Sequence, residues 1–234
     1  MTDQNPSVRT VNMGRRRDRI LDQARHMIAA GGLDAFNIRK LAEGAQVTVP
    51  TVYNLVGNKQ AVVVALCVEA LEAIEARWAS HHADAPLARA EAVITESVGL
   101  FAEDESYYRA ALLALEYLNQ SAVHHGEVFD IYRRGEALIA AGCSACVDAR
   151  LLRGHIPVEQ YGRQVLRAFR TSYHEWALGH ISIDTFRREA LSDIYTILAA
   201  DAVETFRVTL INKIAALNVG VTTAAEQHHT QGKE

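Results

Sequence analysis

The stretch NIRKLAEGAQVTVPTVYNLVGNK, residues 37–59, decides how the rest of the chain is interpreted. Its apolar residues recur at helical spacing in two short runs, which predicts two helices joined by a tight turn. Asn37 and Thr48 stand where helix N-caps are expected. Pro50 falls in the first turn of the second helix, where no backbone N–H is needed. The pattern is typical of a helix-turn-helix.

The second predicted helix, residues 49–55, is too short to be stable alone, so its neighbours must hold it in place. Its N-terminal and outward positions carry small or polar side chains, and such a face fits the major groove of DNA. An ordinary helical hairpin inside a larger bundle is the alternative interpretation of the same pattern.

A longer pattern surrounds this motif: RRRDRILDQARHMIAAGGLDAFNIRKLAEGAQVTVPTVYNLVGNKQAVVVAL, residues 15–66. It resembles the N-terminal domain of the TetR family of transcriptional repressors. The shared features are a Thr-hydrophobic-Tyr signature at residues 51–53, a lysine at position 59 and the glycine pair that ends the first helix. The resemblance implies phosphate contacts from Thr48, Thr51, Tyr53 and Lys59. It places Val49, Pro50 and Asn54 nearest the base edges.

Two positions depart from the family pattern. Gln46 stands in the turn where the family usually has glycine, and a left-handed backbone there costs a glutamine about 1 kcal/mol that glycine avoids. Val56 replaces the family's aromatic residue at the end of the second helix, which weakens the packing but keeps an apolar contact. We also assign Asn37 and Arg39, at the start of the first short helix, to the DNA interface.

Basic residues are concentrated around this motif, although the whole chain has a net charge of −4. Residues 1–60 hold nine Lys+Arg and five Asp+Glu, whereas the remaining residues hold 15 and 23. This local excess favours binding to DNA phosphates. We expect Arg15, Arg16 and Arg17 to contact the DNA backbone or minor groove; a solvated run of charge is the alternative. Residues 1–12 are polar and lack periodicity, which predicts a disordered leader.

Helical periodicity continues through the rest of the chain, and no convincing strand alternation interrupts it. The predicted fold is therefore all-α. A three-helix DNA-binding domain with the helix-turn-helix spans residues 13–60, and a helical domain for effector binding and dimerisation spans residues 61–218. Residues 219–234 are predicted to be a second disordered tail.

Three features of the second domain can be predicted in more detail. Asn58 is expected to cap a long helix that reaches about His81, joins the two domains and acts as the lever for regulation. Residues 143–157 indicate a loop with at most one helical turn, because Gly142 precedes them and Gly154 lies among them. One helix is expected to begin near Ser182 and continue through Ile214.

Residues 157–216 are predicted to form a homodimer interface, because two long helices from each of two chains can bury apolar stripes in a four-helix bundle. In a TetR-like arrangement, aromatic and apolar side chains of several helices surround a cavity for a small apolar or aromatic ligand. The predicted ligand residues are Phe101, Tyr108, Leu112, Leu115, Glu116, Phe129, Tyr132, Phe169, Tyr173 and Trp176.

Arrangements typical of enzymes are missing from the sequence. His174-Glu175 begins like a zinc-protease helix, but Leu178 stands where the second histidine would be. No Gly-x-Ser-x-Gly or glycine-rich phosphate loop occurs, and we assign no catalytic residue, cofactor or metal ligand. Cys143 and Cys146 form a lone C-x-x-C that is interpreted as two packing residues rather than half of a metal or redox site.

The longest apolar run, residues 61–68, is too short to span a bilayer, and no secretion signal is recognised. We therefore expect a cytoplasmic protein without membrane contact, whose partners are double-stranded operator DNA, a second copy of the chain and a small-molecule effector. A helical interaction protein that reads no DNA, or a metal or redox sensor, is the alternative function.

Overall fold

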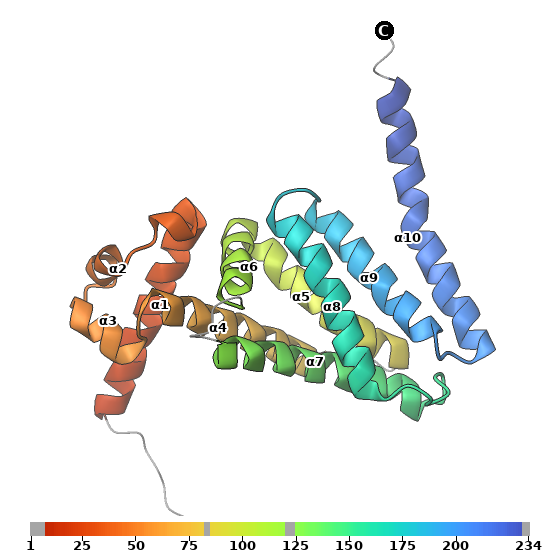
Figure 1. The fold of residues 1–234 in the computed structure, drawn as a ribbon, viewed down its shortest axis with the longest axis horizontal. Coiled ribbons are helices and arrows are strands. Elements are labelled where there is room, and N and C mark those ends of the chain that lie inside the picture. Colours follow the sequence, from red (N-terminus) through yellow and green to blue (C-terminus); the bar gives the residue numbers. More distant parts are fainter. Residues whose placement is uncertain (1–7, 82–84, 120–124, 231–234) are drawn as a thin grey trace, which may run out of the picture. The chain divides into compact units, whose positions relative to one another are not determined.

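The computed structural model describes residues 8–81, 85–119 and 125–230, and this part of the chain contains ten α-helices (Figure 1). The helices are α1 Val8–Ala35, α2 Ile38–Gly44, α3 Val49–Leu55, α4 Lys59–Ser80, α5 Pro86–Glu103, α6 Glu105–Asn119, α7 His125–Asp148, α8 Val158–Ala177, α9 Ile183–Ala199 and α10 Glu204–Thr230. β pairing within these residues is limited to one isolated bridge between Leu152 and Ala202. The predicted all-α fold is confirmed. A search of the described helices finds none that combines the length and the apolar character of a membrane span.

The chain divides into two compact units. The first comprises Met1–Ala73 and Phe101–Ile131, and the second comprises Ile74–Leu100 and Tyr132–Glu234. Helices α4, α5 and α7 each contribute residues to both units. Helix α6 belongs to the first unit together with α1, α2 and α3, so this division differs from the predicted domain boundary near residue 60.

The first unit is built around an apolar stripe on α1. Residues of this stripe recur at the spacing of one helical face, and they pack against α2 and α3 as well as against α6. Helix α6 lies along α1 with one of the most extensive helix contacts in the described structure. The buried members of the cluster are Ile20, Leu21, Ala24, Ile28, Phe36, Leu41, Ala42, Ala45, Val52, Val62, Leu66, Tyr107 and Ala111.

The second unit has an aromatic core between α8 and α9. Trp176 is fully buried and stacks on Phe186, with 5.7 Å between the ring centroids. The Phe169 ring also packs on Phe186, with 5.1 Å between the ring centroids. Helix α10 then packs on α9, so that α8, α9 and α10 follow one another in a layer (Figure 1).

The N-terminal part of α1 corrects one prediction. The helix begins at Val8, so residues 8–12 are helical rather than disordered, and residues 1–7 of the predicted leader lie outside the described residues. No proline follows Pro6 in this segment, and the run of arginines has good helix propensity. The glycine pair ends the regular helix as predicted, because Gly32 has φ 66° and one further turn leads to Ala35.

The prediction of a loop at residues 143–157 is wrong for its first part, because α7 continues to Asp148. Gly142 does not break the helix; it lies inside α7 and allows α5 to approach closely. A Cβ atom at this position would lie 3.2 Å from the Cα atom of Ala90. Cys143 and Cys146 are buried on the same face, so close packing explains all three residues.

The predicted single helix from Ser182 through Ile214 is in fact two helices, α9 and α10, separated by residues 200–203. Asp201 is 3% exposed, and its carboxylate accepts hydrogen bonds from the backbone N–H of His155 at 3.0 Å and from the Tyr161 hydroxyl at 3.3 Å. The Asp201 carbonyl also accepts from the backbone of Arg153 at 2.9 Å. The chain turns here because its polar groups bond to the α7–α8 loop instead of continuing a helix.

Helix α10 continues to Thr230, which corrects the prediction of a disordered tail for residues 219–230. Gly220 does not end the helix, because glycine inside a helix costs only about 1 kcal/mol. No proline follows it. Residues 231–234 lie outside the described residues.

Replacing Asp201 with Asn is expected to destabilise the folded protein by about 1–3 kcal/mol at neutral pH, because an amide is a weaker acceptor for these donors. Burial raises the pKa of Asp201, but hydrogen bonds from Ile156, His155 and Tyr161 outweigh burial and lower it overall. A carboxyl with a lowered pKa stabilises the fold above its unfolded pKa, and this contribution is lost as the pH falls through the folded value. Thermal unfolding of wild type and Asp201→Asn should therefore converge at acidic pH. A difference that stays constant with pH would contradict the assignment.

Candidate nucleic-acid interface

The helix-turn-helix is held by side-chain caps at the start of each helix. The Asn37 side chain accepts a hydrogen bond from the backbone N–H of Lys40 at 2.9 Å. The Thr48 hydroxyl accepts from the N–H of Thr51 at 3.3 Å and lies 2.8 Å from the Thr51 hydroxyl. Both predicted caps are confirmed, and they define where α2 and α3 begin.

The turn between α2 and α3 contains a left-handed residue. Gln46 has φ 54°, in the left-handed region that glycine usually occupies. The backbone of the turn is held by hydrogen bonds from Gln46 N–H to the Glu43 carbonyl at 3.1 Å and from Val47 N–H to the Ala42 carbonyl at 2.9 Å. The turn thus keeps its shape with glutamine in place of glycine, at a steric cost of about 1 kcal/mol.

Helix α3 presents a buried side to the core and an open side to solvent. Val52 is completely buried, whereas Tyr53 is 53% exposed and Asn54 lies beside it on the surface. The predicted contact residues of α3 divide accordingly: Thr48, Pro50, Tyr53 and Asn54 are exposed, and Val49 and Thr51 are half-buried. Asn37 and Arg39 of the preceding helix are also exposed.

Lys59, another predicted phosphate contact, is half-buried. Its ammonium group donates a hydrogen bond to the Leu33 carbonyl at 2.7 Å and lies 5.8 Å from the centre of the Phe36 ring. The side chain therefore links the start of α4 to the end of α1. Asn58, which precedes it, caps α4 by accepting from the N–H of Ala61 at 2.8 Å, as predicted.

The three predicted arginines of α1 are in different environments. Arg15 and Arg16 are exposed, whereas Arg17 is half-buried and forms an ion pair with Glu69 of α4 at 3.6 Å. Sequence reasoning missed Arg25, which pairs with Glu69 at 3.2 Å and lies over the Tyr107 ring of α6 at 5.4 Å. The sequence gives little indication of these contacts, because an arginine between apolar helix positions ordinarily lies on a solvated face.

Residues 20–66 match the family model described as "Bacterial regulatory proteins, tetR family". This part of the chain belongs to the tetR family. The matched residues include α2, α3 and the first turns of α4. The resemblance inferred from the sequence is confirmed, and DNA binding and transcription regulation are the functions that it supports.

Solved structures extend the TetR comparison over most of the chain. A TetR transcriptional regulator from Rhodococcus sp. RHA1 has a TM-score of 0.63 at 14% identity and covers 79% of this chain and 97% of its own. SmeT, the repressor of the Stenotrophomonas maltophilia multidrug efflux pump SmeDEF, has 0.60 at 19% identity, with coverage of 81% and 92%. Thermus thermophilus FadR in complex with lauroyl-CoA has 0.61 at 20% identity, with coverage of 80% and 96%. These likenesses show the fold. No curated protein matches the chain.

The predicted ligand residues are divided between the two units. In the first unit, Phe101 and Leu115 are buried, while Tyr108, Leu112 and Glu116 are half-buried. Phe129 is 56% exposed. The structure brings Phe101 and Tyr108 together, with 5.1 Å between their rings.

The second unit contains the other four predicted ligand residues. Phe169, Tyr173 and Trp176 are buried, and the rings of Phe169 and Trp176 already pack on Phe186. Tyr132 is half-buried, and the Arg170 guanidinium lies 4.0 Å from the centre of its ring. In this structure these side chains contribute to the core of the unit.

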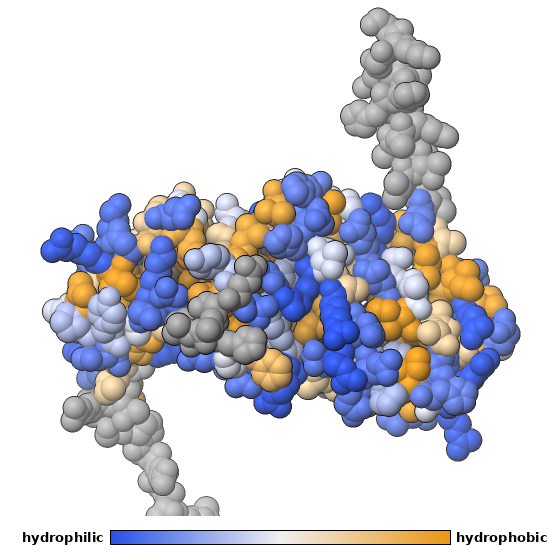
Figure 2. All heavy atoms as spheres, viewed as in Figure 1, coloured by the Kyte–Doolittle hydropathy of each residue, from blue (hydrophilic) through white to orange (hydrophobic). Residues whose placement is uncertain are grey.

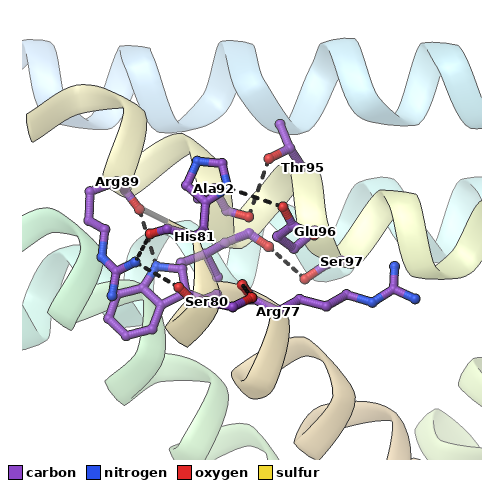
Figure 3. A network of polar contacts seen from close by, with 10 residues as sticks. Arg77, Ser80, His81, Arg89, Ala92, Thr95, Glu96 and Ser97 are labelled. Atoms are coloured by element: carbon purple, nitrogen blue, oxygen red, sulfur yellow. Dashed lines mark hydrogen bonds and ion pairs between the residues drawn. The ribbon is translucent and has the colours of Figure 1, made fainter. Parts of the chain in front are cut away.

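The far end of α4, the predicted lever helix, is bound to α5 by Arg89, which sequence reasoning also missed (Figure 3). Its guanidinium lies 3.5 Å from the centre of the Trp78 ring and donates to the Trp78 carbonyl at 2.6 Å and to the His81 carbonyl at 2.5 Å. His81 in turn lies 3.3 Å from the Glu96 carboxylate. A cation bonded to the last carbonyls of a helix is favoured by the helix dipole.

The two cysteines of the C-x-x-C motif are fully buried thiols. Burial raises the pKa of Cys143 to about 12 and that of Cys146 to about 11, so both are protonated at neutral pH. Protonated thiols are poor nucleophiles and poor metal ligands. A search of the described residues for three neighbouring His, Cys, Asp or Glu side chains with the geometry of a metal site finds none.

Replacing Arg16 with Ala is expected to lower the salt dependence of DNA binding by about one unit in the slope of log K against log salt, because one phosphate contact is lost. Arg153→Ala is the matched control, since Arg153 is also exposed but lies in the loop between α7 and α8 and is no predicted DNA contact, so its slope should equal that of wild type. Fluorescence anisotropy on any DNA duplex suffices, because phosphate contacts are independent of sequence. Equal slopes for wild type and Arg16→Ala would show that Arg16 does not reach the DNA.

Proposed function

We propose that this protein is a transcriptional repressor that binds a palindromic operator as a homodimer and is released by a small apolar or aromatic ligand. The observation that carries the proposal is the tetR-family helix-turn-helix, with both helices capped and the outward side of α3 open to solvent. No catalytic role is proposed for any residue. Such a repressor acts where the DNA is, in the cytoplasm.

The need for a dimer follows from the size of the recognition helix. Helix α3 has only seven residues, so one copy contacts few bases. Two copies related by a two-fold axis double the readout, provided that successive major grooves, roughly 34 Å apart, are reached together. The interface of this homodimer is proposed within residues 157–216, which include α8, α9 and the first half of α10.

In the proposed DNA interface, phosphate contacts and base contacts affect binding differently. We propose that Thr48, Thr51 and Tyr53 bind phosphates, and that Val49, Pro50 and Asn54 lie against base edges. Lys59 can join the phosphate contacts only by exchanging its bond to Leu33 O, so its replacement affects stability as well as affinity.

Asn54→Ala is expected to change the preferred operator sequence at one or two positions in each half-site, because a side chain that bonds base edges carries sequence information. Tyr53→Phe should instead weaken binding to all sequences alike. Selection of bound sequences from random duplex DNA measures both effects and also identifies the operator. A palindromic consensus supports the proposal, whereas binding without sequence preference overturns it.

The salt dependence of binding to DNA distinguishes the proposed repressor from the alternative, a helical interaction protein that reads no DNA. A protein that neutralises phosphates loses affinity steeply between low and physiological salt, through counterion release. Affinity for duplex DNA that does not change over this range would favour the alternative.

The effector is proposed to act through α6 as well as through α4. Helix α6 carries Tyr108, Leu112 and Glu116 among the proposed ligand residues, and its Tyr107 and Ala111 lie in the apolar cluster of α1. A ligand that displaces α6 therefore disturbs the packing that supports α3. Arg25 adds a polar link, because it contacts Glu69 of α4 and Tyr107 of α6.

Lauric acid and other fatty acids are the first probes to test as effectors, because they are small and apolar and a FadR of the same fold was solved with lauroyl-CoA, which carries the same acyl chain. An effector should raise the melting temperature and weaken operator binding, because it must bind the DNA-free state better by a few kcal/mol. Leu112→Arg should abolish the stabilisation and leave operator affinity intact. A compound that stabilises the protein without releasing DNA would refute induction by that class of ligand.

A further inference from the structure

Helix α1 begins well before the part of the chain that matches the tetR-family model. The match starts at residue 20, whereas α1 starts at Val8, so the first three turns of the helix precede it. We call residues 8–19 the basic arm. Ile20 is the first buried residue of α1, and the side chains described for residues 11–19 are exposed except for Arg17, which is half-buried. The arm therefore contributes no residue to the apolar core of the first unit.

The basic charge of the N-terminal region is concentrated on this arm. It holds five arginines and one acidic residue, Asp18, whereas residues 20–60 hold four Lys+Arg and three Asp+Glu. Two of those four cations, Arg25 and Lys59, are engaged by other groups of the first unit. The helix-turn-helix thus has few cations of its own, so much of the attraction for DNA phosphates must come from the arm. Figure 2 shows strongly hydrophilic side chains over several parts of the surface, and the arm is the part where they are almost all of one sign.

Three arginines of the arm lie on one side of the helix. At 3.6 residues per turn, Arg15 and Arg19 are about 40° apart around the axis, and Arg16 lies about 60° beyond Arg19. All three are exposed. Arg17 lies on the opposite side, where it pairs with Glu69 of α4 at 3.6 Å. We call Arg15, Arg16 and Arg19 the arginine stripe.

Two carboxylates lie near this stripe. Asp18 is exposed and is about 60° from Arg15 around the axis. Asp22 follows one turn later, and its carboxylate is paired with the Arg25 guanidinium at 3.1 Å. The stripe therefore keeps an excess of positive charge on the side of α1 that faces away from the core.

The helical structure of the arm decides which part of a DNA duplex it can reach. An α-helix with its side chains is about 10–12 Å across, whereas the minor groove of B-DNA is about 6 Å wide. An extended segment could enter that groove, but residues 8–19 are helical. Arginines on the surface of a helix can instead meet phosphate oxygens along the backbone. A preformed helix also loses little conformational entropy when it binds.

The arm continues beyond α3. Helix α1 contacts α3, and Figure 1 shows the first turns of α1 running past it toward the N-terminus. Twelve helical residues span about 18 Å, which corresponds to about five base pairs of duplex. The arginine stripe can therefore meet phosphates outside the base pairs that α3 faces.

A basic helix can also bind an anionic membrane surface, but that mode requires an apolar face. Val11 and Met13 of the arm are 40% and 46% exposed. Because they are two positions apart, they lie on nearly opposite sides of the helix and form no common face. Positive charge without an apolar face favours DNA phosphates.

We propose that the arginine stripe binds the phosphate backbone of the operator beyond the base pairs that α3 reads, and that it supplies much of the affinity that is independent of sequence. The inference rests on the proposed function, because the duplex is the same operator. It adds Arg19 to the DNA contacts and assigns Arg17 to the packing of α1 on α4.

The first test is the salt dependence of operator binding by the full chain, measured by fluorescence anisotropy. The arm variant, Arg15→Ala/Arg19→Ala, should lower the slope of log K against log salt by about two for each protomer bound, because two phosphate contacts are lost. Arg150→Ala/Arg153→Ala is the matched control, since it removes two exposed arginines from the loop after α7 and should leave the slope unchanged. Circular dichroism must show equal helix content. Equal slopes for the arm variant and wild type would overturn the proposal.

The second test is hydroxyl-radical footprinting of the bound operator. Wild type should protect backbone positions outside the bases that α3 contacts, and the arm variant should lose only that protection. Exchanging A·T for G·C pairs beneath the extra protection should change affinity by less than about threefold, because phosphate contacts carry no base identity. A strong preference for A·T pairs there would indicate insertion into the minor groove and would refute the backbone contact.

The outcomes separate this inference from the proposed function. A wild type that binds a palindromic operator, with a salt slope and a footprint that the arm variant leaves unchanged, overturns the inference and leaves the repressor proposal intact. A wild type that binds no duplex DNA overturns both. Binding to phosphatidylglycerol vesicles that the arm variant abolishes, with no change in the salt slope on DNA, would assign the arm to a membrane surface and overturn the inference.

Discussion

The first unit depends on the burial of one apolar stripe of α1. Ile20, Leu21, Ala24 and Ile28 are almost completely inaccessible, and they are covered from different sides by the short helices α2 and α3 and by α6. Helix α3 could not persist in water with only seven residues, so its conformation is a consequence of this packing. The helix that presents the candidate DNA contacts and a helix that bears candidate effector contacts thus share one hydrophobic core, in which a change of volume on one side is felt on the other.

Two side-chain cations that bind backbone carbonyls at helix ends also hold α4 in place. Lys59 donates to the carbonyl of Leu33 near the end of α1, and Arg89 donates to carbonyls at the end of α4. The last carbonyls of a helix have no partner within the helix and carry partial negative charge, which explains why a side-chain cation is favoured there. Helix α4 therefore has a polar attachment at its first residue and another at its last turn.

In the second unit, the polar contacts of α10 and its exposed apolar residues lie on opposite sides of the helix. Glu91 bonds both Tyr195 and Lys213, which holds α10 on α9 by a carboxylate from α5. Asp201 fixes the turn before α10 by gathering donors from the α7–α8 loop. These contacts determine the rotation of α10 about its own axis, and that rotation is what directs Val208 and Ile211 outward.

The sequence by itself determined the helix-turn-helix, because its caps, its proline and its apolar spacing act within a few residues of one another. Asn37, Thr48 and Asn58 could be assigned as caps for that reason, and the structure confirms them. Tertiary structure decided where the later helices end. Gly142 proved to be a point of close helix packing and Asp201 the reason for a break, and both depend on residues about 50 positions away along the chain. It also decided that Arg17 and Arg25 pair with Glu69, and that Leu198 faces inward while Ile211 faces outward, since periodicity places a residue on a helix face but does not say what that face meets.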